Sequence, residues 1–268
     1  MIRPPASKEE VANFLRDRVE PLHITYGIGE HPQYQTLSLS QLNTVLLYEP
    51  EEMIISVGAG ISLQALERAL AEHGQWIPTL AADEVPQDRL GDAIANDYYH
   101  PRSLTCGMLR TSILGGTFCT TNGEIFQSGS RVVKSVAGYD IHRAFCGSRG
   151  MFGAMISLTM KVQPRPGMFF RFQTSSEHKD TLHRFTPTVF EILGDEIVVE
   201  LAGHSEDIES DIEQLRVEKI TSRELNNTDW LDALQLIRSN KKNAPIASEA
   251  EHLLSKVRTV FDPKNILR

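Results

Sequence analysis

The chain has 268 residues, 41% of them hydrophobic and 23% charged, and a formal net charge of -8. These values are typical of a soluble globular protein with one or two domains. Affinity for nucleic acid comes mainly from clustered lysine and arginine, so the acidic balance argues against a nucleic-acid partner. No apolar run is long enough to cross a bilayer and the first residues have no signal-peptide core, so we expect a cytoplasmic protein without a transmembrane segment.

The three cysteines are Cys106, Cys119 and Cys146. Their spacing fits neither a paired metal site nor an iron–sulfur cluster, and an odd number argues against a disulfide framework. We therefore expect reduced cysteines that serve packing, and no metal site.

The first part of the chain predicts an α/β arrangement. Capping-box spacing from Ser7 and an apolar stripe predict a helix over residues 8–18. Ser62 is expected to cap a second helix, and Gly74 to end it. Strands are predicted at residues 22–26, 44–48 and 53–57.

An antiparallel element and a set of helices are predicted to follow. Asn122-Gly123 is a strong hairpin signal that joins a β-rich run at residues 112–121 to a return strand at 124–127. The prolines of Pro164-Arg165-Pro166 close a strand at 154–163 and are expected to mark a boundary. Beyond them we expect strands at residues 168–173 and 196–201, and helices that begin near Ser205, Thr228 and Ser248.

The most specific feature of the sequence is a glycine-punctuated stretch. It reads Val-Ala-Gly-Tyr-Asp at residues 136–140 and Gly-Ser-Arg-Gly-Met-Phe-Gly-Ala-Met-Ile at residues 147–156. Glycines let the main chain lie against a flat ring or a diphosphate, where a Cβ would intrude or a positive φ is required. The order and spacing of the two elements resemble the FAD domain shared by p-cresol methylhydroxylase, vanillyl-alcohol oxidase and the FAD-binding subunits of glycolate oxidase.

This resemblance extends to other parts of the chain and implies a fold. The hairpin Thr121-Asn122-Gly123-Glu124 and the ending Phe261-Asp262-Pro263 are similar to the same subunits. The implied fold class is α+β: a p-cresol methylhydroxylase-type (PCMH-type) FAD-binding fold of two α/β subdomains, followed by a small truncated α+β cap. The implied domains are an FAD-binding domain at residues 1–166 and a reduced C-terminal cap at residues 167–268.

The resemblance also implies a cofactor and its site. FAD would be held non-covalently, because His31 of the first loop is out of register for a covalent bond. The implied cofactor-binding residues are Gly27, Gly29, Gly91, Gly138, Tyr139, Asp140, Gly147, Gly150, Gly153 and Ile156. The alternative is that Gly138, Gly147, Gly150 and Gly153 only serve turns of an inherited fold, and that Tyr139 and Asp140 are packing and turn residues.

Two loops depart from the family pattern. The first diphosphate loop reads Tyr26-Gly27-Ile28-Gly29-Glu30, which adds a carboxylate where backbone amides should meet phosphate. The second loop, residues 85–100, keeps Leu90, Gly91 and the small Ala95, while Pro86 removes an amide donor. Residues 168–268 contain no motif matching the substrate-binding residues of active relatives, so the catalytic residues are unknown.

Three functions follow from these observations. In the first, the chain is an FAD-linked oxidoreductase subunit that oxidises glycolate or another small 2-hydroxy acid by hydride transfer to flavin. It would work with a second flavin subunit and an iron–sulfur subunit, in the cytoplasm or peripheral to the membrane through that complex. In the second, it has lost FAD and acts as a non-catalytic binding or scaffold subunit. The third, an unrelated α+β enzyme, has no Ser-His-Asp, HExxH or P-loop signature to support it.

Overall fold

The computed structural model describes residues 3–97, 99–129, 140–241, 258 and 260–268. The chain divides into two compact units. Unit 1 comprises Met1–Tyr98, Leu109–Gln163 and Pro245–Arg268, and unit 2 comprises Tyr99–Met108 and Pro164–Ala244. The domain division predicted at residue 166 remains a prediction.

The helices of unit 1 begin where the sequence places capping residues. The Ser7 hydroxyl accepts a hydrogen bond from the Glu10 amide (3.2 Å), and the Ser62 hydroxyl accepts one from the Ala65 amide (3.1 Å). Both predicted helices are therefore confirmed. The helices of this unit are α1 (Lys8–Asp17), α2 (Leu63–Ala71), α3 (Leu90–Asn96) and α5 (Leu109–Ser112), with 3-10 turns η1 (Pro50–Glu52) and η2 (Ile141–Phe145).

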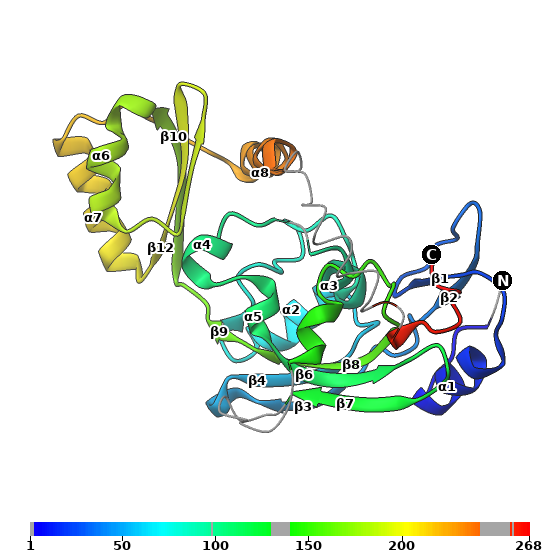
Figure 1. The fold of residues 1–268 in the computed structure, drawn as a ribbon. Coiled ribbons are helices and arrows are strands. Elements are labelled where there is room, and N and C mark those ends of the chain that lie inside the picture. Colours follow the sequence, from blue (N-terminus) through cyan, green and yellow to red (C-terminus); the bar gives the residue numbers. More distant parts are fainter. Residues whose placement is uncertain (1–2, 98, 130–139, 242–257, 259) are drawn as a thin grey trace. The chain divides into compact units, whose positions relative to one another are not determined.

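Unit 1 contains an antiparallel five-stranded sheet and a parallel strand pair (Figure 1). The order in the sheet is β3 (Val45–Glu49), β4 (Ile54–Gly58), β8 (Ala154–Lys161), β6 (Ile113–Cys119) and β7 (Ile125–Gly129). The parallel pair is β1 (Leu22–Thr25) with β2 (Gln35–Ser38), and the short strands are β5 (Gln75–Trp76) and β9 (Gln163–Pro164). The predicted Asn122-Gly123 hairpin is confirmed, since β6 pairs with β7 and Gly123 has φ +75°.

The two faces of this sheet differ in polarity because side chains alternate along each strand. Ile55, Val57 and Leu158 are buried in the core, on the side where Figure 1 shows α2, α3 and α5. Their neighbours Ser56, Ser157 and Thr159 line a pocket on the opposite face. The sheet therefore has one apolar face that anchors the helices and one polar face.

The C-terminal segment lies beside β1. The Leu22 amide donates to the Ile266 carbonyl (2.7 Å), and the Arg268 amide donates to the Leu22 carbonyl (2.9 Å). Asp262, which is 2% exposed, accepts hydrogen bonds from the amides of Ile266 and Leu267, each at 3.0 Å. The tail that resembles glycolate oxidase subunits thus fixes the strand from which the first loop emerges.

Unit 2 is an antiparallel sheet with apolar side chains on both faces. The sheet order is β11 (Val189–Leu193), β12 (Glu196–Gly203), β10 (Met168–Ser175) and β13 (Ser222–Glu224). The helices are α4 (Ser103–Cys106), α6 (Lys179–Leu182), α7 (Ser205–Val217) and α8 (Asn227–Lys241), with 3-10 turns η3 (Ser176–His178) and η4 (His183–Phe185). Phe172 packs with residues of α6 and α7, whereas Val198 packs with Trp230 and Leu234 of α8, so helices cover both faces (Figure 1).

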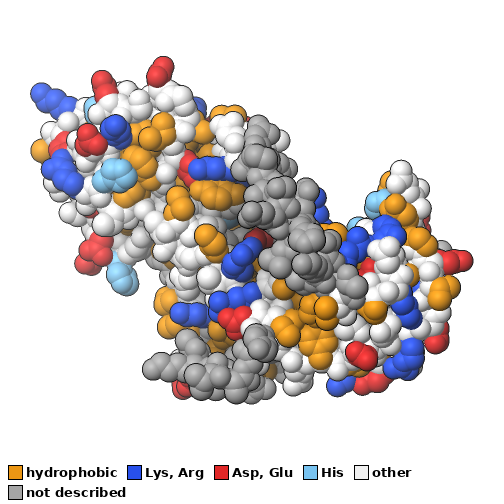
Figure 2. All heavy atoms as spheres, in the orientation of Figure 1, with side chains coloured by type: hydrophobic (Ala, Val, Ile, Leu, Met, Phe, Trp, Pro, Cys, Tyr) orange, Lys and Arg blue, Asp and Glu red, His pale blue; other side chains and the backbone are white. Residues whose placement is uncertain are grey.

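The strands and helices predicted for unit 2 are confirmed as β10, β12, α7 and α8. Strands β11 and β13 were missed, and β13 has no alternating pattern because all three of its residues are exposed. The helix predicted near Ser248 lies outside the described residues. None of the helices in the described part is both long and apolar enough to cross a membrane. On the face drawn in Figure 2, acidic and basic side chains of the described residues are interspersed.

Candidate functional site

Three segments that the sequence assigns to a cofactor meet within unit 1. They are residues 25–27 after β1, residues 88–92 at the start of α3, and residues 147–153 before β8, and we call them together the glycine junction. The Gly147 amide donates to the Ile94 carbonyl of α3 (3.0 Å), and the Met155 amide donates to the Tyr26 hydroxyl (2.8 Å). Segments far apart in the sequence are thereby held together by one main-chain hydrogen bond and one from a main-chain amide to a side-chain hydroxyl.

Two glycines of the junction have no room for a side chain. A Cβ on Gly91 would lie 2.2 Å from Cγ of the Tyr26 ring, which is 1% exposed. A Cβ on Gly153, which has φ +116°, would lie 2.3 Å from the Cys119 carbonyl oxygen. Both positions need glycine because protein atoms already occupy the space, whether or not a ligand is present.

The remaining glycines of the 147–156 element have a different constraint. Gly147 and Gly150 have φ +76° and +79°, and the nearest atoms to an added Cβ are 3.5 and 3.7 Å away. Here backbone conformation, rather than crowding, favours glycine. Ile156 is 7% exposed, and its carbonyl accepts a hydrogen bond from the Ala59 amide (3.0 Å). This part of the predicted site is well formed as a turn into β8.

The first loop meets a carboxylate from α3. The two Asp92 carboxylate oxygens accept hydrogen bonds from the Tyr26 amide at 3.1 and 3.2 Å, and from the Thr25 hydroxyl at 3.3 and 3.4 Å. Gly27 is buried, and a Cβ there would lie 3.5 Å from the same carboxylate. The sequence drew attention to Glu30, but Glu30 is exposed and Asp92 is the residue that reaches the loop amides.

The electrostatic surroundings of Asp92 disfavour its charge. Desolvation by burial raises the pKa of Asp92, hydrogen bonds from Tyr26 and Thr25 oppose this shift, and the neighbouring Asp88 adds to it. The Arg89 guanidinium is engaged elsewhere, with Nη1 3.1 Å from the Gly60 carbonyl and Nε 3.4 Å from Asp88. Burial also raises the pKa of Tyr26, so its hydroxyl stays protonated.

Gly29 lies away from this crowded part, in an open loop. No atom lies within 4 Å of a Cβ added there, and the residue lines a pocket of about 340 Å³. The pocket is lined by Pro4, Ile28, Gly29, Glu30, His31, Tyr34, Gln35, Thr36, Ser38, Ser40 and Gln41. The His31 ring stacks on Tyr34 with centroids 4.9 Å apart, and its Nδ1 accepts from the Gln33 amide (3.2 Å). His31 thus shapes its own loop.

Gly138, Tyr139 and Asp140 are the remaining residues of the predicted site. Gly138 and Tyr139 lie outside the described residues. Asp140 is exposed, precedes η2 without capping it through its side chain, and pairs with Arg143 at 3.3 Å. In the described part of the chain, Asp140 therefore has the contacts of a turn residue.

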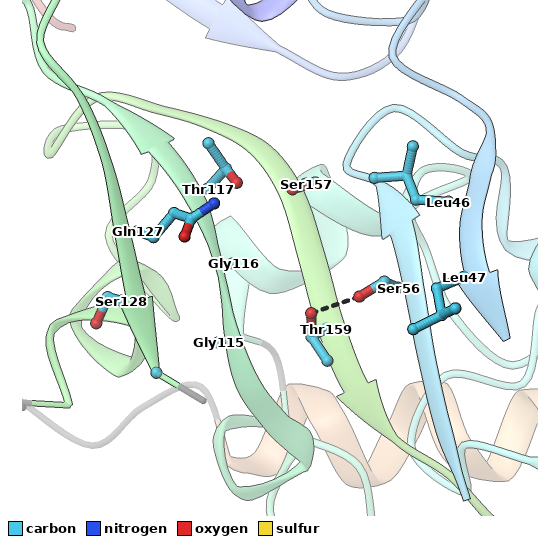
Figure 3. A pocket seen from close by; sticks show the side chains of 11 residues that line it. Leu46, Leu47, Ser56, Gly115, Gly116, Thr117, Gln127, Ser128, Ser157 and Thr159 are labelled. Carbon is cyan, nitrogen blue, oxygen red and sulfur yellow. Dashed lines mark hydrogen bonds between the residues drawn. The ribbon is translucent and has the colours of Figure 1, made fainter. Parts of the chain in front are cut away.

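A second pocket, of about 370 Å³, lies on the polar face of the five-stranded sheet (Figure 3). Ser56 and Thr159 point into it and share a hydrogen bond of 2.5 Å, with Thr117 and Gln127 on neighbouring strands (Figure 3). None of the predicted cofactor residues that the structure describes lines it. The sequence did not reveal this pocket, because its polar residues, such as Ser56, Ser157 and Thr159, alternate with core residues and form no motif.

Unit 2 contains a buried polar cluster that the sequence did not reveal. Arg102 and Glu200 are both fully buried, and two guanidinium nitrogens of Arg102 donate to the two carboxylate oxygens, each at 2.6 Å. Arg171 donates to the same carboxylate (2.8 Å), and the Thr188 hydroxyl donates at 3.0 Å. The Arg171 guanidinium lies 4.6 Å from the Trp230 ring centroid. Because all these contacts are internal to unit 2, the cluster is a structural element of that unit.

The fold and the glycine junction together define a class of protein. Helices and sheets are mixed in this α+β fold, and its glycine segments meet in one unit, as the resemblance to the PCMH-type FAD-binding fold implies. Residues 24–129 match the family described as "FAD binding domain". This match confirms the resemblance found in the sequence and the FAD-type character of the domain, and it includes the first and second loops of the junction.

Proteins of known activity are similar to the same part of the chain. The chain is 33% identical over 139 residues to the glycolate oxidase subunit GlcE of Escherichia coli (strain K12), which covers 52% of this chain and 40% of the relative. It is 28% identical over 173 residues to the mitochondrial D-lactate dehydrogenase [cytochrome] of Arabidopsis thaliana, covering 60% of this chain and 30% of the relative. The resemblance to FAD-linked oxidoreductases is thus confirmed, and the chain spans less than half the length of these two relatives.

A solved structure shares the fold. Alkyldihydroxyacetonephosphate synthase superimposes with a TM-score of 0.61 at 15% sequence identity, over 86% of this chain and 53% of that chain. At this identity the likeness concerns the fold alone. It confirms the predicted α+β fold class.

The junction fits FAD only in part. Amides of Ile28, Gly29 and Glu30 make no hydrogen bond among the described residues, and they border the pocket beside His31. Three other amides of the junction are occupied. The Asp92 carboxylate accepts from the Tyr26 amide, and the carbonyls of Ile61 and Ala59 accept from the amides of Leu90 and Gly91. A diphosphate placed beside the Tyr26 amide would meet the carboxylate of Asp92 rather than a free donor. The backbone scaffold is retained, but the position beside the Tyr26 amide does not fit a diphosphate while Asp92 occupies it.

Proposed function

We propose that this chain is a subunit of an FAD-linked oxidoreductase that acts on a small 2-hydroxy acid such as glycolate, within a complex. The observation that carries the proposal is the convergence, in one unit, of two loops inside the matched FAD-binding domain with the glycine segment that follows it, residues 147–153. The relatives named as glycolate oxidase subunit and D-lactate dehydrogenase support a 2-hydroxy acid as the substrate class. The name "subunit" supports a complex, in which partners would include a second flavin subunit and an iron–sulfur subunit.

In this proposal the chain's own residues provide a backbone scaffold. Gly27, Gly29, Gly91, Gly147, Gly150 and Gly153 keep main chain free of side chains, and FAD would supply the hydride acceptor when bound. Asp140, Ile156 and the two positions outside the described residues, Gly138 and Tyr139, complete the proposed site. The proposed domains are residues 1–166 for the cofactor and residues 167–268 for a reduced cap.

The absorbance spectrum tests this proposal. The purified chain, and the chain co-expressed with its partner subunits, are compared before and after addition of excess FAD. Flavin bands that bleach when a 2-hydroxy acid such as glycolate is added anaerobically support the proposal. A colourless protein that takes up no FAD in either form contradicts it.

A specific observation favours a second candidate, a non-catalytic binding or scaffold subunit. The Asp92 carboxylate already satisfies the loop amide that an FAD diphosphate would need. Under this second function the chain stays colourless with excess FAD, yet the partner subunits assemble only in its presence. Size-exclusion chromatography of the complex with and without this chain separates the two functions.

A further inference from the structure

We propose that Asp92 is a built-in counter-anion that fills the anion position of the first loop, and that this position accepts a diphosphate only when the Asp92 carboxylate is removed. The choice of FAD as the displaced ligand rests on the proposed function, whereas the anion position itself does not. The proposal concerns a single contact between α3 and the residues that follow β1.

The contact has the geometry of a bound anion. Both carboxylate oxygens lie within 3.1 to 3.4 Å of the Tyr26 amide nitrogen and the Thr25 hydroxyl. The Gly27 amide lies next to them and donates to the same Thr25 hydroxyl (3.3 Å). A main-chain amide and a hydroxyl that both donate to one carboxylate are donors of the kind that proteins use to bind anions.

Asp92 does not serve the purpose usual for an acidic residue in a first helical turn. Such a carboxylate ordinarily interacts with the amides of its own helix. Here α3 has no side-chain cap at Arg89, and the Asp92 side chain instead reaches the amide of a residue 66 positions earlier in the chain. The amides of Leu90 and Gly91 donate to the carbonyls of Ile61 and Ala59, at 3.0 and 2.8 Å.

The surrounding charges oppose a second anion. Asp88 lies beside Gly27, with a carboxylate oxygen 3.6 Å from the Gly27 Cβ position. The nearest basic group, Arg89, already contacts Asp88 and the Gly60 carbonyl. An incoming diphosphate would therefore compete with Asp92 for the donors and be repelled by it.

Calorimetric titration of the full chain with inorganic pyrophosphate, and separately with FAD, tests the proposal. The variants are Asp92→Ala, which removes the carboxylate, and Asp92→Asn, which keeps one acceptor oxygen and removes the charge. Asp88→Ala is the matched control, because it removes a neighbouring carboxylate that accepts from no loop amide in the described structure. Thermal unfolding shows that each variant is folded.

Asp92→Ala frees the Tyr26 amide and the Thr25 hydroxyl to donate to pyrophosphate, and a hydrogen bond to a charged group is worth more than a neutral one. This variant should therefore bind pyrophosphate about tenfold or more tighter than the unaltered chain. Asp92→Asn should show a smaller gain, and Asp88→Ala a gain under about threefold. If Asp92→Ala does not fold, the Asp92→Asn result decides.

The results separate this inference from the proposed function. Gains for both pyrophosphate and FAD support both. A gain for pyrophosphate without any FAD binding supports the anion position and contradicts the FAD function. No gain in folded Asp92 variants, or an equal gain in Asp88→Ala, overturns the inference, because the effect would then be absent or only a matter of net charge.

Discussion

The glycine junction of unit 1 and the arginine–glutamate cluster of unit 2 hold distant segments together in opposite ways. In the junction the segments approach because side chains are absent, as where Gly91 leaves room for the Tyr26 ring. In unit 2 they approach because charged side chains are present, with Arg102 and Arg171 on Glu200. Contacts that depend on absent side chains can be predicted from glycines in the sequence, whereas a buried ion pair leaves no pattern in the sequence.

The largest expected effect comes from breaking the unit 2 cluster. Arg102→Met leaves the Glu200 carboxylate buried with one fewer partner, which should lower the free energy of unfolding of unit 2 by about 3–5 kcal/mol. Trp230 fluorescence during urea unfolding, in a Trp76→Phe background, reports on this unit. The control is Arg184→Met, because Arg184 pairs with Glu218 on the surface and is 63% exposed, so it should cost about 1 kcal/mol or less. Equal effects of the two variants would contradict a special role of the buried cluster.

The junction should be broken by adding one carbon atom. Gly91→Ala places a Cβ against the buried Tyr26 ring, and the resulting strain should cost about 1–3 kcal/mol of unit 1 stability. Trp76 fluorescence in a Trp230→Phe background measures it. Gly29→Ala is the matched control, since no atom lies within 4 Å of its Cβ position, and its change should stay within about 0.5 kcal/mol. A neutral Gly91→Ala would show that the junction is not closely packed.

The pH dependence of stability sharpens the role of Asp92. Because burial raises its pKa, the folded state binds the Asp92 proton more tightly than the unfolded state does. The stabilising effect of the protonated form is therefore lost as the pH rises from the unfolded pKa of 3.8 through the raised folded value. Hydrogen bonds from Tyr26, Thr25 and Gly27 lower this pKa, whereas the charge of Asp88 raises it.

Compared with the unaltered chain, Asp92→Asn should accordingly gain in relative stability as the pH rises through that window. Urea unfolding at pH 4 and pH 7 measures the difference. A stability difference that is the same at both pH values would show that the carboxylate is not desolvated in the folded state.

The smallest expected effect is a difference in thiol reactivity between the cysteines of the two units, which can be measured without changing the sequence. Burial raises the pKa of Cys119 to about 11 and also raises the pKa of Cys146, both in unit 1. Cys106 of unit 2 is half-buried. A thiol reagent at pH 8 should therefore modify Cys106 first, and all three cysteines only after unfolding. Rapid reaction of Cys119 or Cys146 in the folded chain would contradict the packing described for unit 1.

The sequence predicted those elements of unit 1 that have local signals, but not β2, α3 or α5. Ser7, Ser62 and the Asn122-Gly123 hairpin act within a few residues of themselves. The glycines of residues 147–153 were also recognisable, since their positive φ values limit the residue type.

What could not be predicted depends on partners distant in the sequence. Asp92 meets an amide 66 residues away, and Arg102 meets a carboxylate 98 residues away. No periodicity or spacing in the sequence predicts either contact. For this reason the sequence pointed to Glu30 as the carboxylate of the first loop, whereas the folded chain brings Asp92 there. Strand β13 was missed because its exposed residues carry no hydrophobic alternation.

We propose that the glycine junction is an FAD-type scaffold whose anion position is filled by Asp92. A crystal structure of the Asp92→Ala variant with pyrophosphate tests it most directly. The account predicts phosphate oxygens within hydrogen-bonding distance of the Tyr26 amide and the Thr25 hydroxyl, with the junction glycines unmoved. Pyrophosphate bound elsewhere, with these donors left to water, would contradict the claim.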